Sequence, residues 1–147
     1  MTAATMAPAP TRSHFATADP LRARTFMDQT YGGRLVIKGS RESSWQLSVD
    51  QVAARQVVSG DVRLPADLTF EVDGHDEVVV NTVLAGSVEY ENDDLDERCR
   101  LGDVYAGNHP DLHCVCHTHE LRSHTITLPR SLIAGVAADA DGESAVD

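Results

Sequence analysis

The sequence predicts a mainly β domain, an antiparallel sandwich or barrel with a helix at each end, on three observations. From about residue 33 to residue 128, apolar and polar residues alternate with a period of two, as in half-buried strands. Asp-Gly and Ala-Gly steps, with Pro65 and Pro110, interrupt these runs about every 8–12 residues, which is the rhythm of antiparallel sandwiches and barrels. The chain has 147 residues, of which 41% are hydrophobic, enough for one domain with a buried core.

The first helix is predicted over residues 19–31. Asp19 suits the N-cap, Pro20 fits the first turn, and the Gly32-Gly33 pair provides a stop. Four residues follow the i, i+3, i+4, i+7 spacing of one helix face: Ala23, Phe26, Met27 and Thr30. Residues 1–13 are rich in Ala, Pro and Thr and lack the cationic and apolar regions of a secretory signal, so we expect a disordered tail.

The predicted strands begin with GRLVIKG, SWQLSVD, RQVVSGDVRL and DLTFEVD, followed by DEVVVNTVLAG, the longest apolar run and the expected central strand. SVEYEN and ERCRLGDVYAG flank the acidic loop ENDDLDE, and LHCVCHT and SHTITL form a final hairpin. A closing helix starts at Pro129 with Leu132, Ile133 and Val136 on one face, and residues 139–147 form a disordered acidic tail. The predicted core consists of Trp45, Leu47, Val49, Phe70, Val72, Val78, Val80, Val83, Leu84, Tyr105, Ile126 and Leu128.

The segment HPDLHCVCHTHELRSH, residues 109–124, holds five of the seven histidines and two of the three cysteines. Within it, His119, Glu120 and His124 resemble the zinc-protease signature H-E-x-x-H. The spacing of five residues, however, places the two imidazoles roughly 140° apart around a helix. The two rings then cannot share one ion, so the spacing excludes a zinc-protease site.

A strand at LHCVCHT would point His113 and His117 to one face and Cys114 and Cys116 to the other, as small core residues. At the predicted hairpin tip, His117 and His119 supply at most two metal ligands, and the others would have to come from elsewhere. We therefore expect polar hairpin residues, no metal and no other cofactor. A metal site built from some of these histidines is the alternative.

Charge and composition exclude several classes of function. The formal charge is −11, with 12 Lys and Arg against 23 Asp and Glu, and the arginines are scattered. Nucleic-acid binding needs clustered cations that displace counterions from phosphates, so we expect no direct DNA binding. No apolar run is long enough to span a membrane, and three cysteines without disulfide spacing suit a cytoplasmic protein. The sequence has no P-loop, G-x-G-x-x-G or G-x-S-x-G motif, and we expect no enzymatic activity.

Four stretches, taken in order, resemble a known family: FATADPLRARTFMDQTYGG, LAGSVEY, LGDVYAGNHPD and TITLPRSLIAGVA. Their order and spacing are similar to the N-terminal domain of AraC-type transcriptional regulators, in the subclass that opens with a short helix and closes on an L-P-R-x-L helix. The likeness covers residues 14–138. It implies a cupin-like antiparallel β-barrel, or jelly roll, that binds a small-molecule effector and helps the regulator to dimerise.

The function that this resemblance implies is an effector-binding and dimerisation module of an AraC-type regulator, here without the family's DNA-reading domain. Its second partner would be a protein subunit, in a homodimer or in a heterodimer with a full-length regulator. The metal-ligating cupin pattern, H-x-H followed by Glu in the first half of the barrel, is absent, because residues 117–120 lie in the wrong strand with the wrong spacing. A metal-dependent cupin enzyme using the His- and Cys-rich hairpin is the alternative, and a truncated or degenerate regulator is a third possibility.

The ligand site is expected at the mouth of the barrel, where a closed sheet leaves room for one small ligand. The candidate ligand-binding residues are inward-facing polar or aromatic positions: Trp45, Asn81, Tyr105 and His113. The simpler role for Trp45 and Tyr105 is that of plain core residues. No catalytic residue is assigned.

Overall fold

Nine antiparallel strands and two helices form the part of the chain that the computed structural model describes, which comprises residues 9–36, 46–64, 67–73, 76–92, 95–106, 113–136 and 138. The named elements, in chain order, are β1 (Thr11–Thr17), α1 (Pro20–Tyr31), β2 (Gly33–Val36), β3 (Leu47–Ala54), β4 (Val57–Arg63), β5 (Asp67–Val72), β6 (Glu77–Asn92), β7 (Leu95–Cys99), β8 (Val104–Ala106) and β9 (Cys114–Pro129). A second helix covers residues 130–136. The mainly β, antiparallel fold class is confirmed.

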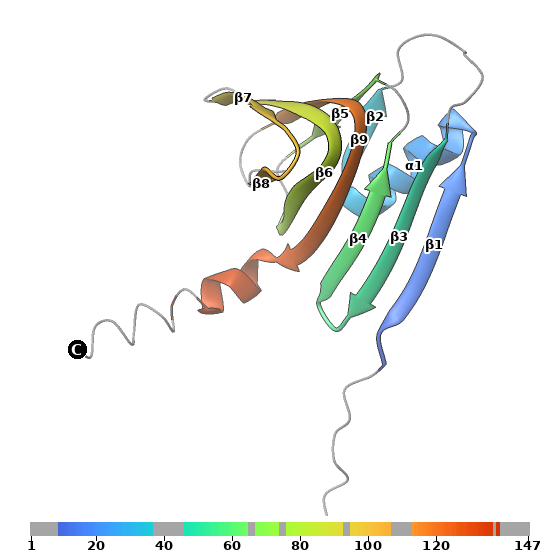
Figure 1. Ribbon diagram of the computed structural model, residues 1–147. Coiled ribbons are helices and arrows are strands. Elements are labelled where there is room, and N and C mark those ends of the chain that lie inside the picture. Colours follow the sequence, from blue (N-terminus) through green and yellow to red (C-terminus); the bar gives the residue numbers. More distant parts are fainter. Residues whose placement is uncertain are drawn as a thin grey trace, which may run out of the picture.

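The long strand β9 organises the sheet. The strand order is β1-β3-β4-β9-β5-β2, and β6 pairs with β7, β8 and β9. Figure 1 shows that the sheet curls into a half-barrel, with β1, β3 and β4 side by side and α1 lying across them. The second helix continues beyond the end of β9, away from the sheet. No helix among the described residues is long and apolar enough to cross a membrane.

Helix α1 forms where the sequence predicts it, because both of its ends are capped locally. The Asp19 carboxylate accepts a hydrogen bond of 3.0 Å from the Leu21 backbone N–H. At the other end, Gly32 has a left-handed conformation with φ of 66° and donates its N–H to the Asp28 carbonyl at 2.9 Å. The helix buries one face inside the curl of the sheet, through Ala23, Met27 and Tyr31.

The predicted final hairpin is wrong, because β9 is one continuous strand of 16 residues with a bend at Glu120. Its first half pairs with β5 and its second half with β4, while β6 runs beside nearly its whole length. At the bend, Glu120 has a φ of 47°, and the facing strand has Gly86 at a φ of 73° with two register shifts around it. The Ala85-Gly86 step is therefore a β-bulge and not a turn.

Strand β1 lies partly in the predicted tail. The composition of residues 11–13 predicts disorder, whereas β1 begins at Thr11 and pairs with β3 up to Thr17. Phe15 of this strand stacks on Phe26 of α1, with 4.0 Å between the ring centroids. Five of the seven residues of β1 are exposed, as is common at the edge of a sheet, so the strand carries no apolar alternation to reveal it.

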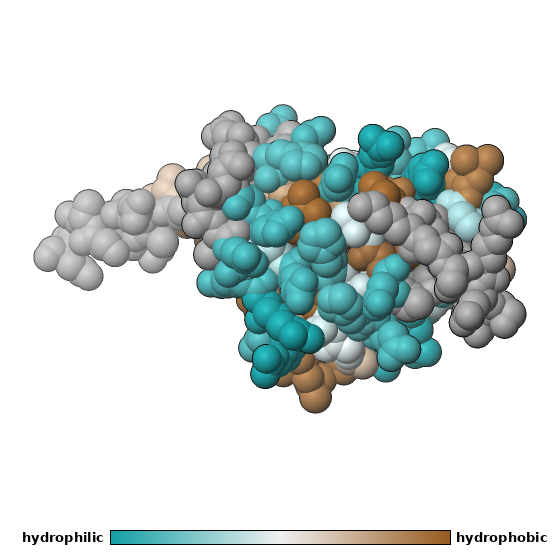
Figure 2. All heavy atoms as spheres, turned by 90° about the horizontal axis from the view of Figure 1, so that it is seen from above, coloured by the Kyte–Doolittle hydropathy of each residue, from teal (hydrophilic) through white to brown (hydrophobic). Residues whose placement is uncertain are grey.

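The core prediction is correct in part. Leu47, Val49, Val72 and Val83 are buried, Phe70 and Tyr105 pack against the core, and Trp45 lies outside the described residues. The remaining predictions are wrong, because the residues are half-buried or exposed: Val78, Val80, Leu84, Ile126 and Leu128. In β9 the inward face is displaced by one residue from the predicted face, which exchanges inside for outside along the strand. In β6 the displacement affects Val78 and Val80, whereas Val83 is buried as predicted. The face seen in Figure 2 is mostly hydrophilic, with separate hydrophobic spots.

Candidate ligand cavity

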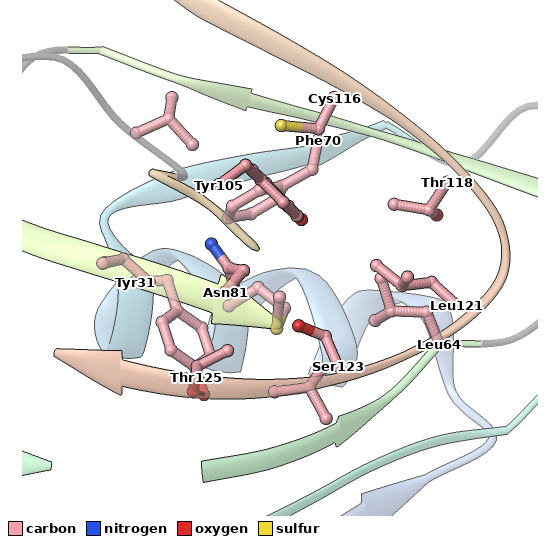
Figure 3. A pocket seen from close by; sticks show the side chains of 14 residues that line it. Tyr31, Leu64, Phe70, Asn81, Tyr105, Cys116, Thr118, Leu121, Ser123 and Thr125 are labelled. Atoms are coloured by element: carbon pink, nitrogen blue, oxygen red, sulfur yellow. Dashed lines mark hydrogen bonds between the residues drawn. The ribbon is translucent and has the colours of Figure 1, made fainter. Parts of the chain in front are cut away.

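A cavity of about 70 Å³ lies inside the curl of the sheet, lined from α1, β4, β5, β6, β8 and β9 (Figure 3). Most of its apolar wall comes from six residues: Met27, Val62, Leu64, Phe70, Val79 and Leu121. Val72 also lines it, and hydroxyl, amide and thiol groups complete the lining, from Tyr31, Asn81, Tyr105, Cys116, Thr118, Ser123 and Thr125. The wall is therefore largely apolar with a few polar groups, which is the usual composition of a small-molecule site.

The polar side of the cavity comes from the second half of β9. Side chains alternate across a strand, and here the inward positions are Ser123, Thr125 and Thr127, all buried. Between them, His124 is half-buried and Ile126 is 37% exposed on the outer face. This strand thus places small hydroxyl residues inside and larger residues outside, the reverse of the usual pattern.

Tyr31, at the end of α1, contributes a hydroxyl that is held from two sides. The Gln51 amide donates to the Tyr31 hydroxyl at 3.5 Å, and the Tyr31 and Thr125 hydroxyl oxygens lie 3.4 Å apart. The contact needs the glycine at position 60 of β4, because a Cβ there would lie 2.8 Å from Thr125 Oγ1 and 3.1 Å from the Tyr31 oxygen. The missing side chain of Gly60 therefore leaves room for the contact between Tyr31 of α1 and Thr125 of β9.

Ser123 differs from the other hydroxyl residues of the wall. Its side chain is directed into the cavity (Figure 3), the residue is 2% exposed, and its Oγ has no hydrogen-bond partner. Thr118, by contrast, donates its hydroxyl to the Leu68 carbonyl at 3.3 Å. Nearly all buried polar groups in native proteins are hydrogen-bonded, so an unpaired buried hydroxyl indicates a binding position for a ligand or water.

No lining residue of the cavity carries a formal charge at neutral pH. Burial is the main cause that raises the pKa of Tyr31 and, more strongly, that of Tyr105. Burial also raises the pKa of the Cys116 thiol to about 12, and the neighbouring Cys114 and Cys99 add to this effect. All these groups therefore keep their protons at neutral pH and act as neutral hydrogen-bonding groups.

Two of the four predicted ligand-binding residues line the cavity. Asn81 of β6 and Tyr105 of β8 are paired across neighbouring strands, and both side chains face inward. Trp45 lies outside the described residues. His113 is exposed, with its Nδ1 2.7 Å from Asp73 Oδ1, so its predicted inward direction is wrong. The next residue, Cys114, is buried instead.

Several lining residues were not predicted, and only some had a signal in the sequence. The small hydroxyl residues at positions 123 and 125 are one such signal, but the sequence pattern assigns the apolar Ile126 and Leu128 to the interior instead. Tyr31 was treated as part of a helix and not of a site. Which end of α1 meets β4 and β9 depends on tertiary packing that no local pattern encodes.

His117 and His119, the two possible metal ligands at the predicted hairpin tip, lie on the outer face of the sheet. His117 Nδ1 is 3.0 Å from Thr69 Oγ1, and His119 Nδ1 is 3.0 Å from Asp67 Oδ1. The two cysteines of this segment are buried on the opposite face, so the strand separates the two kinds of ligand. Within the described ranges, no group of three or more His, Cys, Asp or Glu residues is arranged to hold a metal ion.

Comparison with solved structures identifies the fold. The AraC-like transcriptional activator CuxR superposes with a TM-score of 0.66 at 15% identity, covering 88% of this chain and 52% of the CuxR chain. The cupin domain of Schizosaccharomyces pombe Cnp3 gives a TM-score of 0.50 at 13% identity, covering 71% of this chain and 82% of that domain. No protein-family model matches the sequence, and no curated protein does. The half-barrel is thus of cupin type, and the chain spans about half the length of CuxR.

Proposed function

We propose that this chain is an effector-binding and dimerisation module of the kind found in AraC-type regulators. The observation that carries the proposal is the largely apolar cavity with the unpartnered hydroxyl of Ser123 in its wall. The fold likeness to an AraC-like activator supports the same assignment. A small effector in the cavity would touch α1, β6 and β9 together, and so connect the helix to both halves of the sheet.

Signalling by such a module requires two states that differ in affinity for the effector. An effector shifts the equilibrium between the states only by its differential affinity for them. Association between subunits is the change that we propose, because the helix of residues 130–136 leaves apolar side chains exposed. Leu132 and Ile133 are each 38% exposed and Val136 is 65% exposed. Apolar side chains that stay partly exposed, as these three do among the described residues, are typical of a surface that meets another subunit.

The chemistry of the wall supports binding rather than catalysis. A general base or nucleophile needs a pKa near the working pH, or a partner that takes its proton. The titratable lining groups Tyr31, Tyr105 and Cys116 all have raised pKa values and stay protonated at neutral pH. We therefore propose that the protein is not an enzyme.

A variant whose cavity is filled by a larger side chain tests whether the effector binds in the cavity. The chain is screened by thermal shift against a library of small metabolites, and hits are retested on Ser123→Leu, whose longer side chain occupies the cavity. The matched control is Ser48→Leu, at a half-buried position on β3 that is not part of the cavity wall. We expect the hits to stabilise the wild type and the Ser48 variant, to leave Ser123→Leu unchanged, and to shift the monomer–dimer equilibrium in sedimentation. Hits that stabilise Ser123→Leu equally would disprove the cavity as the effector site.

A further inference from the structure

The unsatisfied hydroxyl of Ser123 has a second polar group beside it. In the register of β6 and β9, Val83 faces Ser123 and Asn81 faces Thr125. Asn81 and Ser123 are thus diagonal neighbours on the inner face, with Cα atoms about 7–8 Å apart. Figure 3 shows both polar side chains directed into the same cavity. One hydrogen-bonding group of a ligand can reach both of them.

The wall opposes a charged ligand of either sign. None of the lining residues is Asp, Glu, Lys, Arg or His. A charge that enters a largely apolar cavity loses its hydration and finds no opposite charge, which costs far more than hydrogen bonds to neutral groups return. Tyr105 and Cys116 do not help, because burial raises both pKa values and keeps these groups neutral.

The size of the cavity limits the ligand to a small molecule. Its volume is about 70 Å³. An engineered cavity of about 150 Å³ in another protein holds benzene. The space inside this cavity is about half of that volume, so the part of a ligand that lies inside it is a short branched or cyclic body of a few carbon atoms.

We infer that the ligand of this cavity is a compact, uncharged molecule with a short apolar body and one carbonyl, amide or hydroxyl group, which is bound by Ser123 and Asn81. The inference rests on the proposed function, since it names the ligand class of the same site. The Ser123 hydroxyl donates to the ligand oxygen, and the Asn81 amide offers both a donor and an acceptor to the same group. The body lies against Phe70 and Leu121.

The test uses three small probes that share a branched skeleton: isobutyramide, isobutyrate and isobutylammonium. Each is titrated into the full chain at pH 7 and followed by amide chemical shifts in NMR spectra. We expect isobutyramide to bind with millimolar affinity and to shift residues of β6 and β9 that face the cavity. Both charged probes should bind at least about tenfold more weakly, because each would enter without its hydration shell.

Two serine variants test the contact itself. Ser123→Ala should weaken isobutyramide binding about fivefold to tenfold, as expected for the loss of one hydrogen bond. Ser48→Ala, outside the cavity, should leave it unchanged. Equal binding of isobutyramide to Ser123→Ala and the wild type would overturn the inference, as would no isobutyramide binding at about 100 mM.

The outcomes separate this inference from the proposed function. Binding of a charged probe as tight as that of the amide, and sensitive to Ser123→Leu, would overturn the ligand class while it supports a ligand site in the cavity. Binding of isobutyramide alone, without any change in self-association, would support the ligand class and count against regulation through association.

Discussion

Ser123 places an unpaired hydroxyl in the interior, and its removal should stabilise the folded chain. The Oγ atom is buried without a hydrogen-bond partner, so folding takes this group out of water without compensation. We expect Ser123→Ala to raise the free energy of unfolding by about 1 kcal/mol in urea denaturation without ligand. Ser48→Ala, on the outer side of β3, should stay within about 0.5 kcal/mol of the wild type. A loss of stability in Ser123→Ala would mean that the hydroxyl has a bound partner.

Cys116 should make the chain less stable in alkaline solution. Its pKa is about 12 when folded and near 9.0 when exposed, so the folded state holds the proton more tightly. The contribution of the Cys116 thiol to the free energy of unfolding is fully present below pH 9. It is lost between about pH 9 and pH 12, because the thiol ionises first in the unfolded state. Replacing Cys116 by Val removes this group at similar volume.

The measurement for Cys116 is urea denaturation at several pH values. Above pH 9, the free energy of unfolding of the wild type should fall by up to about 1.4 kcal/mol more per pH unit than that of Cys116→Val. Below pH 9, the free energies of unfolding of the two proteins should change with pH in parallel. Parallel curves at every pH would show that the folded thiol titrates as an exposed one does.

At the scale of single residues, the sequence predicts part of the cavity. Asn81 and Tyr105 were predicted as inward-facing polar or aromatic positions, and both line the cavity. Ser123 was missed because a serine beside Ile126 and Leu128 resembles an outward residue when apolar side chains are assigned to the interior. The register of β9 with β4 and β6 places Ser123 and Thr125 on the inner face. The hydrophobic pattern of β9 by itself predicts the opposite face.

Among the secondary-structure elements, the bend shared by β6 and β9 should be the least tolerant position. A Cβ at Gly86 would lie 2.3 Å from the carbonyl oxygens of both His119 and Glu120, and its φ is 73°. Gly86→Ala should therefore lower the free energy of unfolding by about 3 kcal/mol or more. Gly102→Ala is the matched control, because Gly102 has a φ of 89° but nothing within 4 Å of its added Cβ. Gly102→Ala should lower the free energy of unfolding by about 1 kcal/mol.

Glu120 offers the opposite change at the same bend. Its φ of 47° is a left-handed conformation that disfavours a side chain. Glu120→Gly should therefore stabilise the chain by up to about 1 kcal/mol, measured by urea denaturation. A destabilised Glu120→Gly variant would indicate that the side chain makes a contact that outweighs the backbone strain.

The elements with local signals were predicted well, and those with non-local signals were not. Helix α1 has an N-cap, a proline and a glycine stop within its own sequence, and its predicted bounds hold. Strand β9 has no glycine or proline near its bend at Glu120 to mark a bulge, so the two halves of the strand resembled separate strands joined by a turn. Only the pairing of both halves with β6 decides that the chain continues in one direction.

At the scale of the whole molecule, the helix of residues 130–136 should control the association of subunits. We expect the chain to form a dimer at micromolar concentration and Ile133→Glu to make it monomeric, because a charge would be placed in the apolar contact. Ala134→Glu is the control, since Ala134 lies on the other side of the helix and is exposed. Sedimentation velocity distinguishes the two species. A dimer that persists in Ile133→Glu would place the interface elsewhere.

The charge of the chain predicts no affinity for DNA. The formal charge is −11, and binding to phosphates requires a local surplus of Lys and Arg. We expect no binding of the 147-residue chain to DNA in fluorescence anisotropy at about 150 mM salt, with or without isobutyramide. Submicromolar, sequence-selective binding would contradict this expectation and assign a direct role in DNA recognition to the chain.

The central place of β9 also determines the order in which the half-barrel can form during translation. β4, β5 and β6 all precede β9 in the sequence and all pair with it. They leave the ribosome first, with open edges that can pair with other nascent chains. Closure of the sheet must wait until residues 114–129 have followed, so folding depends on long-range pairing, which we expect to make it slow. We therefore expect a chain whose synthesis stops before residue 114 to aggregate and not to fold into part of the half-barrel.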